Sequence, residues 1–175
     1  MLGIDPGSVK TGWALLKAQG RKIHVVASGV LEFNSKTEFL ERLTQISVSS
    51  KNLMRELKPE VIALESLIYV KSPQALIKLA QARGVILAAC VESHQGKIFE
   101  YSPNLVKSSA VGHGHADKES VRKFLDMALG KRNYKTHDES DAVAVAFCHI
   151  MNSGSGSGAK RSGSRGLASS LSHKV

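Results

Sequence analysis

Two short apolar runs in this chain each end on a carboxylate. The first is Leu2-Gly3-Ile4-Asp5, which is followed by Pro6-Gly7-Ser8, and the second is Val61-Ile62-Ala63-Leu64-Glu65. Apolar runs of this length, bounded by turn residues, predict buried strands. A core strand rarely ends on an acid unless something positive lies beside it. The fold must therefore bring the ends of two core strands to a place where negative charge is useful.

Two further acids, Asp138 and Asp141, stand at the start of an apolar segment with helical spacing. Because they are three residues apart, both side chains point to one side of the helix. Each acid alone has a structural explanation: a turn in the case of Asp5, or a favourable charge at a helix N-terminus in the case of Asp138. Four carboxylates on three elements instead favour a site for a hard divalent cation, and we predict magnesium.

The pattern of apolar residues predicts the order strand, strand, strand, helix, strand, helix, strand, helix, helix, helix. The expected ranges are 2–5, 11–16, 24–31, 39–57, 61–64, 73–91, 98–101, a short helix from 103, 117–129 and 138–151. A helix precedes strand 61–64, so the two central strands are expected to be parallel and covered on both faces, as in an α/β fold. In parallel strands of such sheets, Asp5 and Glu65 end at the same edge.

Three glycines carry specific expectations. Gly7 and Gly12 are expected to keep the loop after Asp5 slim enough for a phosphate backbone to approach. Gly84 interrupts the helix expected over 73–91 at a cost of about 1 kcal/mol relative to alanine. We therefore expect Gly84 to permit close approach of another backbone.

Length and composition favour one domain over residues 1–151 and a disordered, basic, Gly/Ser-rich tail over 152–175. The formal net charge of +9 and the pI of about 9.7 favour a polyanionic partner such as nucleic acid. Cys90 and Cys148 lie in apolar helical patterns without CxxC spacing and are expected in the core. We see no signal-peptide pattern and no apolar run near the ~20 residues of a membrane span, so a cytoplasmic protein is expected.

The motifs together resemble those of a known family. Leu2-Gly3-Ile4-Asp5-Pro6-Gly7-Ser8, Ala63-Leu64-Glu65, Gln81-Ala82-Arg83-Gly84 and Asp138-Glu139-Ser140-Asp141-Ala142 are similar, in order and spacing, to the motifs of RuvC-type Holliday junction resolvases. The resemblance covers about residues 1–149. It implies an RNase H-like mixed five-stranded sheet with helices on both faces. It also implies a homodimer that nicks two opposing strands of a four-way DNA junction during recombination and repair.

The resemblance assigns roles to individual residues. Asp5, Glu65, Asp138 and Asp141 match the catalytic, metal-binding carboxylates, which implies two magnesium ions per active site, with manganese as the alternative. Lys107 and Lys118 match basic residues associated with DNA contact and catalysis, and Arg83 belongs to the matched Gln-Ala-Arg-Gly motif and is expected to contact DNA. A junction-migrating helicase complex, of the RuvA and RuvB type, is the implied partner.

Several positions leave alternatives open. Relatives carry an aromatic residue three positions after the glutamate, where this chain has Ile68, followed by Tyr69. Either Tyr69 stacks on DNA bases or Ile68 acts as an apolar wedge, and Tyr69 as a plain surface residue is an equal alternative. His137 is read as a helix-start residue or as an aid to metal chemistry. His113 and His115 are read as part of a flexible loop.

Three other functions compete with a resolvase. The sugar kinase, Hsp70 and actin superfamily also follows a first strand with an aspartate-glycine turn, but it needs a second lobe for which 175 residues leave no room. An RNase H-like nuclease acting on ribosomal RNA precursors is compact enough. A junction-binding protein without catalysis is the third alternative, against which the retention of all four acids argues.

Overall fold

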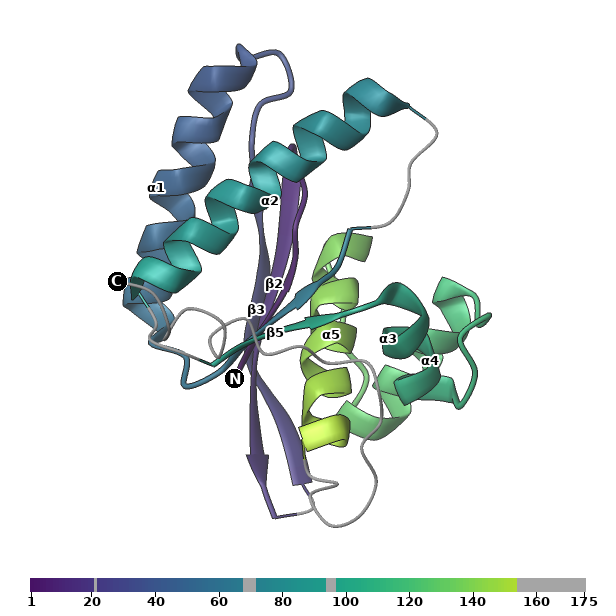
Figure 1. The fold of residues 1–175 in the computed structure, drawn as a ribbon. Coiled ribbons are helices and arrows are strands. Elements are labelled where there is room, and N and C mark those ends of the chain that lie inside the picture. The colour runs from purple at the N-terminus through teal and green to yellow at the C-terminus, as the bar shows by residue number, and fades with distance from the viewer. Residues whose placement is uncertain (21, 68–71, 94–96, 154–175) are drawn as a thin grey trace, which may run out of the picture.

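The structure, a computed structural model, describes residues 1–20, 22–67, 72–93 and 97–153 (Figure 1). These residues form five strands and five helices. In chain order they are β1 (Leu2–Asp5), β2 (Lys10–Gln19), β3 (Lys22–Glu32), α1 (Phe39–Leu57), β4 (Ile62–Glu65), α2 (Pro73–Ser93), β5 (Ile98–Tyr101), α3 (Pro103–Val111), α4 (Lys118–Leu129) and α5 (His137–Ser153). The predicted element order is confirmed.

The strands form one mixed sheet of order β3-β2-β1-β4-β5. β1 pairs antiparallel with β2 and parallel with β4, and β4 pairs parallel with β5. In the central pair, Leu2 lies opposite Ile62 and Ile4 lies opposite Leu64. Asp5 and Glu65 each follow one residue later, so both chains leave the sheet at the same edge. The predicted α/β fold with parallel central strands is confirmed.

Helices cover both faces of the sheet (Figure 1). On one face, α1 and α2 pack on a core that includes Leu2, Ile4 and Ile46. On the other face, α3, α4 and α5 pack on a second core that includes Leu16 and Val143. Burial of side chains on both sides explains why β1 and β4 are short, almost uninterrupted apolar runs.

The boundaries differ from the predicted ones mainly in the hairpin. β2 and β3 extend well past the expected ranges because their antiparallel pairing continues from Lys10–Glu32 to Gln19–Lys22. Polar residues there are tolerated since an antiparallel edge can face water. α5 begins one residue early and continues to Ser153, where Asn152 donates hydrogen bonds to Ser109 and to the backbone carbonyl of Cys148. Residues 154–175 of the predicted tail lie outside the described residues.

The explanation offered for Gly12 is wrong. Gly12 lies within β2, and a Cβ there would come within 1.9 Å of the backbone oxygen of Asp138. The missing side chain therefore lets the first turn of α5 pack directly on the sheet. A side chain is also excluded at Gly7, because a Cβ there would lie 1.9 Å from the carbonyl oxygen of Lys10 in the same turn.

The expectation that no apolar stretch reaches the length of a membrane span is also wrong. α2 has 21 residues and contains an 18-residue window with a mean hydropathy of 1.4, enough to cross a bilayer by length and composition, and 22% of that window is buried in the protein. One face of α2 packs on α1 through residues that include Ala82, Ile86 and Cys90. Gly84, in contrast, has no atom outside its own helix backbone within 4 Å of a built Cβ, so no other described segment of the chain packs closely against it.

Candidate active site

Asp5 and Glu65 lie together at one edge of the sheet, because β1 and β4 are parallel and end level with each other. Burial, followed by the charges of Glu65, Asp141 and Asp138, raises the pKa of Asp5 to about 8. Burial and the charge of Asp141 raise the pKa of Glu65 to about 7, while a hydrogen bond from Asp5 opposes this shift. The charges of the other three predicted acids thus all raise the pKa of Asp5, which means that the structure brings the four carboxylates together in one region.

A lysine from α4 reaches this group. Nζ of Lys118 lies 2.6 Å from Oδ2 of Asp141. The hydrogen bond to Asp141 raises the pKa of Lys118, burial lowers it, and the charges of Asp5 and Glu65 add to the upward shift. Lys107 of α3 also acts on the site, since its charge lowers the pKa of Glu65. Both lysines singled out in the sequence therefore lie within electrostatic reach of the carboxylates.

The start of α5 is fixed by its own local hydrogen bonds. Oγ1 of Thr136 accepts a hydrogen bond from the backbone N–H of Glu139 at 3.3 Å. Oε2 of Glu139 accepts one from the backbone N–H of Lys135 at 2.7 Å. This resembles a capping box, in which a Ser or Thr cap is followed three residues later by Glu. The signal for this cap is local and lies in Thr136-His137-Asp138-Glu139, where Glu139 stands three residues after Thr136.

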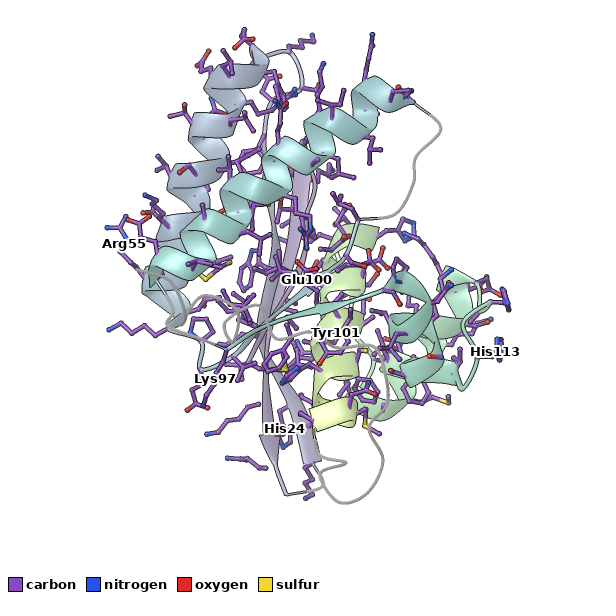
Figure 2. The ribbon with its side chains drawn as sticks, in the orientation of Figure 1. His24, Arg55, Lys97, Glu100, Tyr101 and His113 are labelled. Carbon is purple, nitrogen blue, oxygen red and sulfur yellow. The ribbon has the colours of Figure 1, made fainter. Side chains whose placement is uncertain are left out.

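Arg83 supports the strand that carries Glu65. Its Nε donates a hydrogen bond to the backbone carbonyl of Glu65 at 3.5 Å, and its guanidinium forms an ion pair with Glu100. Glu100 and Tyr101 are neighbours on β5 (Figure 2). Glu100 pairs with Arg83 of α2 on one face of the sheet, and the hydroxyl of Tyr101 is hydrogen-bonded to Nδ1 of His149 of α5 on the other. The expected DNA contact of Arg83 stays a prediction, and the contacts in the structure hold β4, β5 and α2 together.

Some predicted residues are not part of this group. Ile68 and Tyr69 lie outside the described residues. His137 is exposed at the first position of α5, as expected for a helix-start residue. His113 and His115 are exposed in the loop between α3 and α4.

The donor chemistry of the site fits magnesium. Four carboxylates supply hard oxygen ligands. Burial, and after it the charges of neighbouring acids, raises the pKa values of Asp5 and Glu65, and a bound divalent cation would favour their ionised forms. Among the residues that the structure describes, no three His, Cys, Asp or Glu side chains are already arranged to hold an ion. Coordination by Asp141 would have to compete with its ion pair to Lys118.

A cavity of about 940 Å³ lies away from this edge. It is lined from β2, β3 and the ends of α1 and α5, by residues that include Lys17, Val26 and His149, and by none of the four acids. The four acids are each partly exposed, so a large substrate such as a duplex can approach this edge of the sheet.

The sheet order, with its helices on both faces and its acids at the ends of the two central strands, defines an RNase H-like nuclease. A family model described as "Crossover junction endodeoxyribonuclease RuvC" matches residues 1–149. The chain belongs to this family.

Similar proteins agree with that assignment. Crossover junction endodeoxyribonuclease RuvC of Brucella suis biovar 1 (strain 1330) is 32% identical over 85% of this chain and 86% of its own. The same enzyme of Rhizobium johnstonii is 35% identical over 89% of this chain and 91% of its own. The solved structure of T. thermophilus RuvC in complex with Holliday junction substrate has a TM-score of 0.79 and 26% identity, and the match covers 87% of this chain and 93% of that chain.

Proposed function

We propose that Asp5, Glu65, Asp138 and Asp141 are the catalytic carboxylates of a Holliday junction resolvase and hold magnesium. As a member of its family, the chain is a metal-dependent crossover junction endodeoxyribonuclease acting in recombination and repair. The observation that carries the residue assignment is the electrostatic coupling of Asp5 to the other three acids across β1, β4 and α5. Negative charge concentrated at one edge of a basic protein needs a cation before a phosphate can approach.

Each side chain has a role that its position supports. Asp5 and Glu65 provide ligands from the rigid sheet, and Asp138 and Asp141 provide them from the first turn of α5. Bound magnesium, as two ions per site, would supply an activated water and offset charge on the scissile phosphate. Lys118, which is paired with Asp141, would neutralise a phosphate oxygen. Lys107, whose charge lowers the pKa of Glu65, would contact the neighbouring phosphate of the DNA backbone.

One assay tests this function. A synthetic four-way junction, a linear duplex and a structured RNA are each incubated with the protein in magnesium or in chelator, and the products are mapped on every strand. We expect paired nicks in the junction, only with metal, and their loss in Asp5→Asn with junction binding retained. Cleavage of the RNA alone would favour the ribosomal RNA alternative. Binding of the junction without cleavage would favour a non-catalytic protein.

The homodimer predicted for this chain is supported by the outer face of α2. Ile77 and Val91 are 57% and 50% exposed, and Ala80, Gly84 and Ala88 are exposed between them. The spacing of these residues places them on one side of the helix. A second copy of α2 could approach Gly84 closely, because a Cβ there would meet open space. Two sites related by a two-fold axis would then serve two opposing strands.

The remaining predictions rest on the resemblance to the RuvC family or on the composition of the chain. The catalytic domain is assigned to residues 1–151 and the accessory tail to 152–175, although α5 includes the first two residues of that tail. Deleting 154–175 should weaken non-specific DNA binding and flatten its salt dependence without moving the cut. DNA contacts by Ile68, Tyr69 and Arg83, a helicase partner of the RuvA and RuvB type and a cytoplasmic location stay predictions.

A further inference from the structure

Glu139 is a buried carboxylate that stands between two members of the proposed catalytic set. Its side chain is only 6% exposed, whereas Asp138 and Asp141 are half-buried. A carboxylate in such a position is costly unless its oxygens are hydrogen-bonded. Both oxygens of Glu139 have partners, and neither partner belongs to the proposed metal site.

The two partners come from different parts of the fold. Oε2 of Glu139 accepts a hydrogen bond from the backbone N–H of Lys135, in the loop that leads into α5, at 2.7 Å. Oε1 accepts one from Oγ of Ser28 on β3, also at 2.7 Å. Ser28 and Glu139 are 111 residues apart in the sequence. The hydrogen bond from the Lys135 N–H is enough to cap α5. The hydrogen bond from Ser28 therefore has a role other than capping.

The contact with Ser28 ties the first turn of α5 to the sheet. The same turn also packs on β2 at Gly12, where a Cβ would meet the backbone oxygen of Asp138 at 1.9 Å. Packing at Gly12 limits how close the turn can come, and the hydrogen bond at Ser28 limits how far it can move away. The turn that carries Asp138 and Asp141 is therefore fixed relative to β1 and its Asp5.

We propose that Glu139 is a positioning residue that, through Ser28 and the Lys135 amide, sets where Asp138 and Asp141 stand relative to Asp5 and Glu65. Glu139 is assigned no metal-binding role, because its side chain is buried and both of its oxygens face hydrogen-bond donors outside the proposed metal site. The inference rests on the proposed function of the four acids. Partners that orient ligands in this way commonly change metal affinity or activity by about 10- to 100-fold when removed.

The test uses substitutions on both sides of the contact. Glu139→Gln keeps the shape of the side chain and removes its charge. Its amide oxygen can accept from the Lys135 N–H, and its amide nitrogen can contact Ser28 only if the hydroxyl becomes the acceptor, so both hydrogen bonds lose their charge assistance and are weakened. Ser28→Ala removes the contact with β3 and leaves the cap intact, and Ser28→Thr restores a hydroxyl. Glu38→Gln is the matched control, since Glu38 caps α1 by accepting from the N–H groups of Leu40 and Glu41, and α1 carries none of the four acids.

Three quantities are measured on the full chain: the magnesium dependence of single-turnover junction cleavage, junction affinity in calcium, and amide hydrogen exchange of residues 137–141 without metal. For Glu139→Gln we expect the magnesium concentration for half-maximal cleavage to rise about tenfold. Ser28→Ala should give a smaller rise, and Ser28→Thr should return it toward wild type. Exchange should accelerate in both weakened variants, and junction affinity should stay within about twofold.

The possible outcomes are distinct. A wild-type protein that never cleaves the junction contradicts the proposed function, whatever the variants do. If wild type cleaves, and Glu139→Gln and Ser28→Ala leave magnesium dependence and hydrogen exchange unchanged, the positioning role is refuted and the function stands. An equal change in Glu38→Gln would also refute it, because the effect would then reflect general helix capping. If Glu139→Gln fails to fold, Ser28→Ala and Ser28→Thr decide.

Discussion

Helices α5 and α2 are similar in length, but α5 is covered by its own chain and one side of α2 is not. From Glu139 to His149, α5 is buried at every position except Asp141. Over its 21 residues α2 buries four, which are Ala82, Ile86, Ala89 and Cys90. A helix enclosed on its own sheet can hold catalytic groups at fixed positions, whereas an exposed apolar face is suited to contact another molecule.

The same contrast is visible at two glycines. A Cβ on Gly3 of β1 would lie 2.3 Å from the backbone oxygen of Ala142 and 2.8 Å from the Cβ of Ala146, both in α5. A Cβ on Gly84 of α2 would meet nothing within 4 Å. Gly3 is thus explained by packing within the chain, and Gly84 is not. The comparison predicts that changes on α5 affect chemistry and folding, and that changes on the outer face of α2 affect assembly.

The largest effect is expected at the half-buried start of α5. Asp141→Asn removes the charge of a proposed metal ligand with little change in volume and also breaks the ion pair with Lys118. Junction cleavage should fall by orders of magnitude, while junction binding persists or tightens because repulsion of phosphate decreases. Single-turnover cleavage and a binding titration in calcium check this. Near wild-type cleavage by Asp141→Asn would remove Asp141 from the proposed site.

The next effect is on stability and separates the two glycines. Gly3→Ala should destabilise the protein by about 1–3 kcal/mol, because α5 must shift to admit a methyl group. Gly84→Ala should stabilise the monomer by up to about 1 kcal/mol, since the position is helical and unobstructed. Urea unfolding at low protein concentration measures both. If the two variants lose equal stability, the contrast between the two helices is false.

A smaller free-energy change is expected in assembly. Gly84→Arg adds a long charged side chain to the outer face of α2 and should weaken self-association about tenfold or more, equivalent to about 1.4 kcal/mol. Met127→Arg on α4 is the control, because Met127 is 80% exposed on the other side of the sheet. Sedimentation equilibrium over micromolar concentrations measures the dimer. A wild-type protein that is monomeric yet still makes paired nicks would overturn the dimer proposal.

A further expected effect is a dependence of stability on pH. The pKa values of Asp5 and Glu65 in the folded protein, about 8 and about 7, lie above the ordinary values of 3.8 and 4.5. Between these limits the folded state binds more protons than the unfolded state, so the free energy of unfolding falls as pH rises from about 4 to 8. Urea unfolding in chelator at pH 5 and pH 8 tests the sign, and Asp5→Asn should flatten the dependence.

Magnesium should reverse that trend. Because the ion binds the ionised carboxylates, its addition should stabilise the protein more at pH 8 than at pH 5. Equal stabilisation at both values would indicate that magnesium does not bind to these acids.

Much of the fold, and the four acids that the structure brings together at the candidate site, could be predicted from the sequence. Leu2–Asp5 and Ile98–Tyr101 were located to the residue, because short apolar runs between turn residues leave few alternatives. Asp5 and Glu65 could be singled out because an acid at the end of a core strand is unfavourable without a partner. Only the tertiary structure assigned Gly12 to packing against α5, since no local pattern reveals which segment will lie above a strand.

The contact between Ser28 and Glu139 marks the limit of what the sequence determined. Helix capping is local, so Thr136 and Glu139 carried a signal that could have been read within four residues. Ser28 carried none, because an ordinary serine in an alternating strand looks the same whether or not a carboxylate lies above it. The sequence by itself determined which acids exist and which elements carry them. The tertiary structure decided how those elements are held together, because hydrogen bonds between distant segments depend on where the whole chain packs.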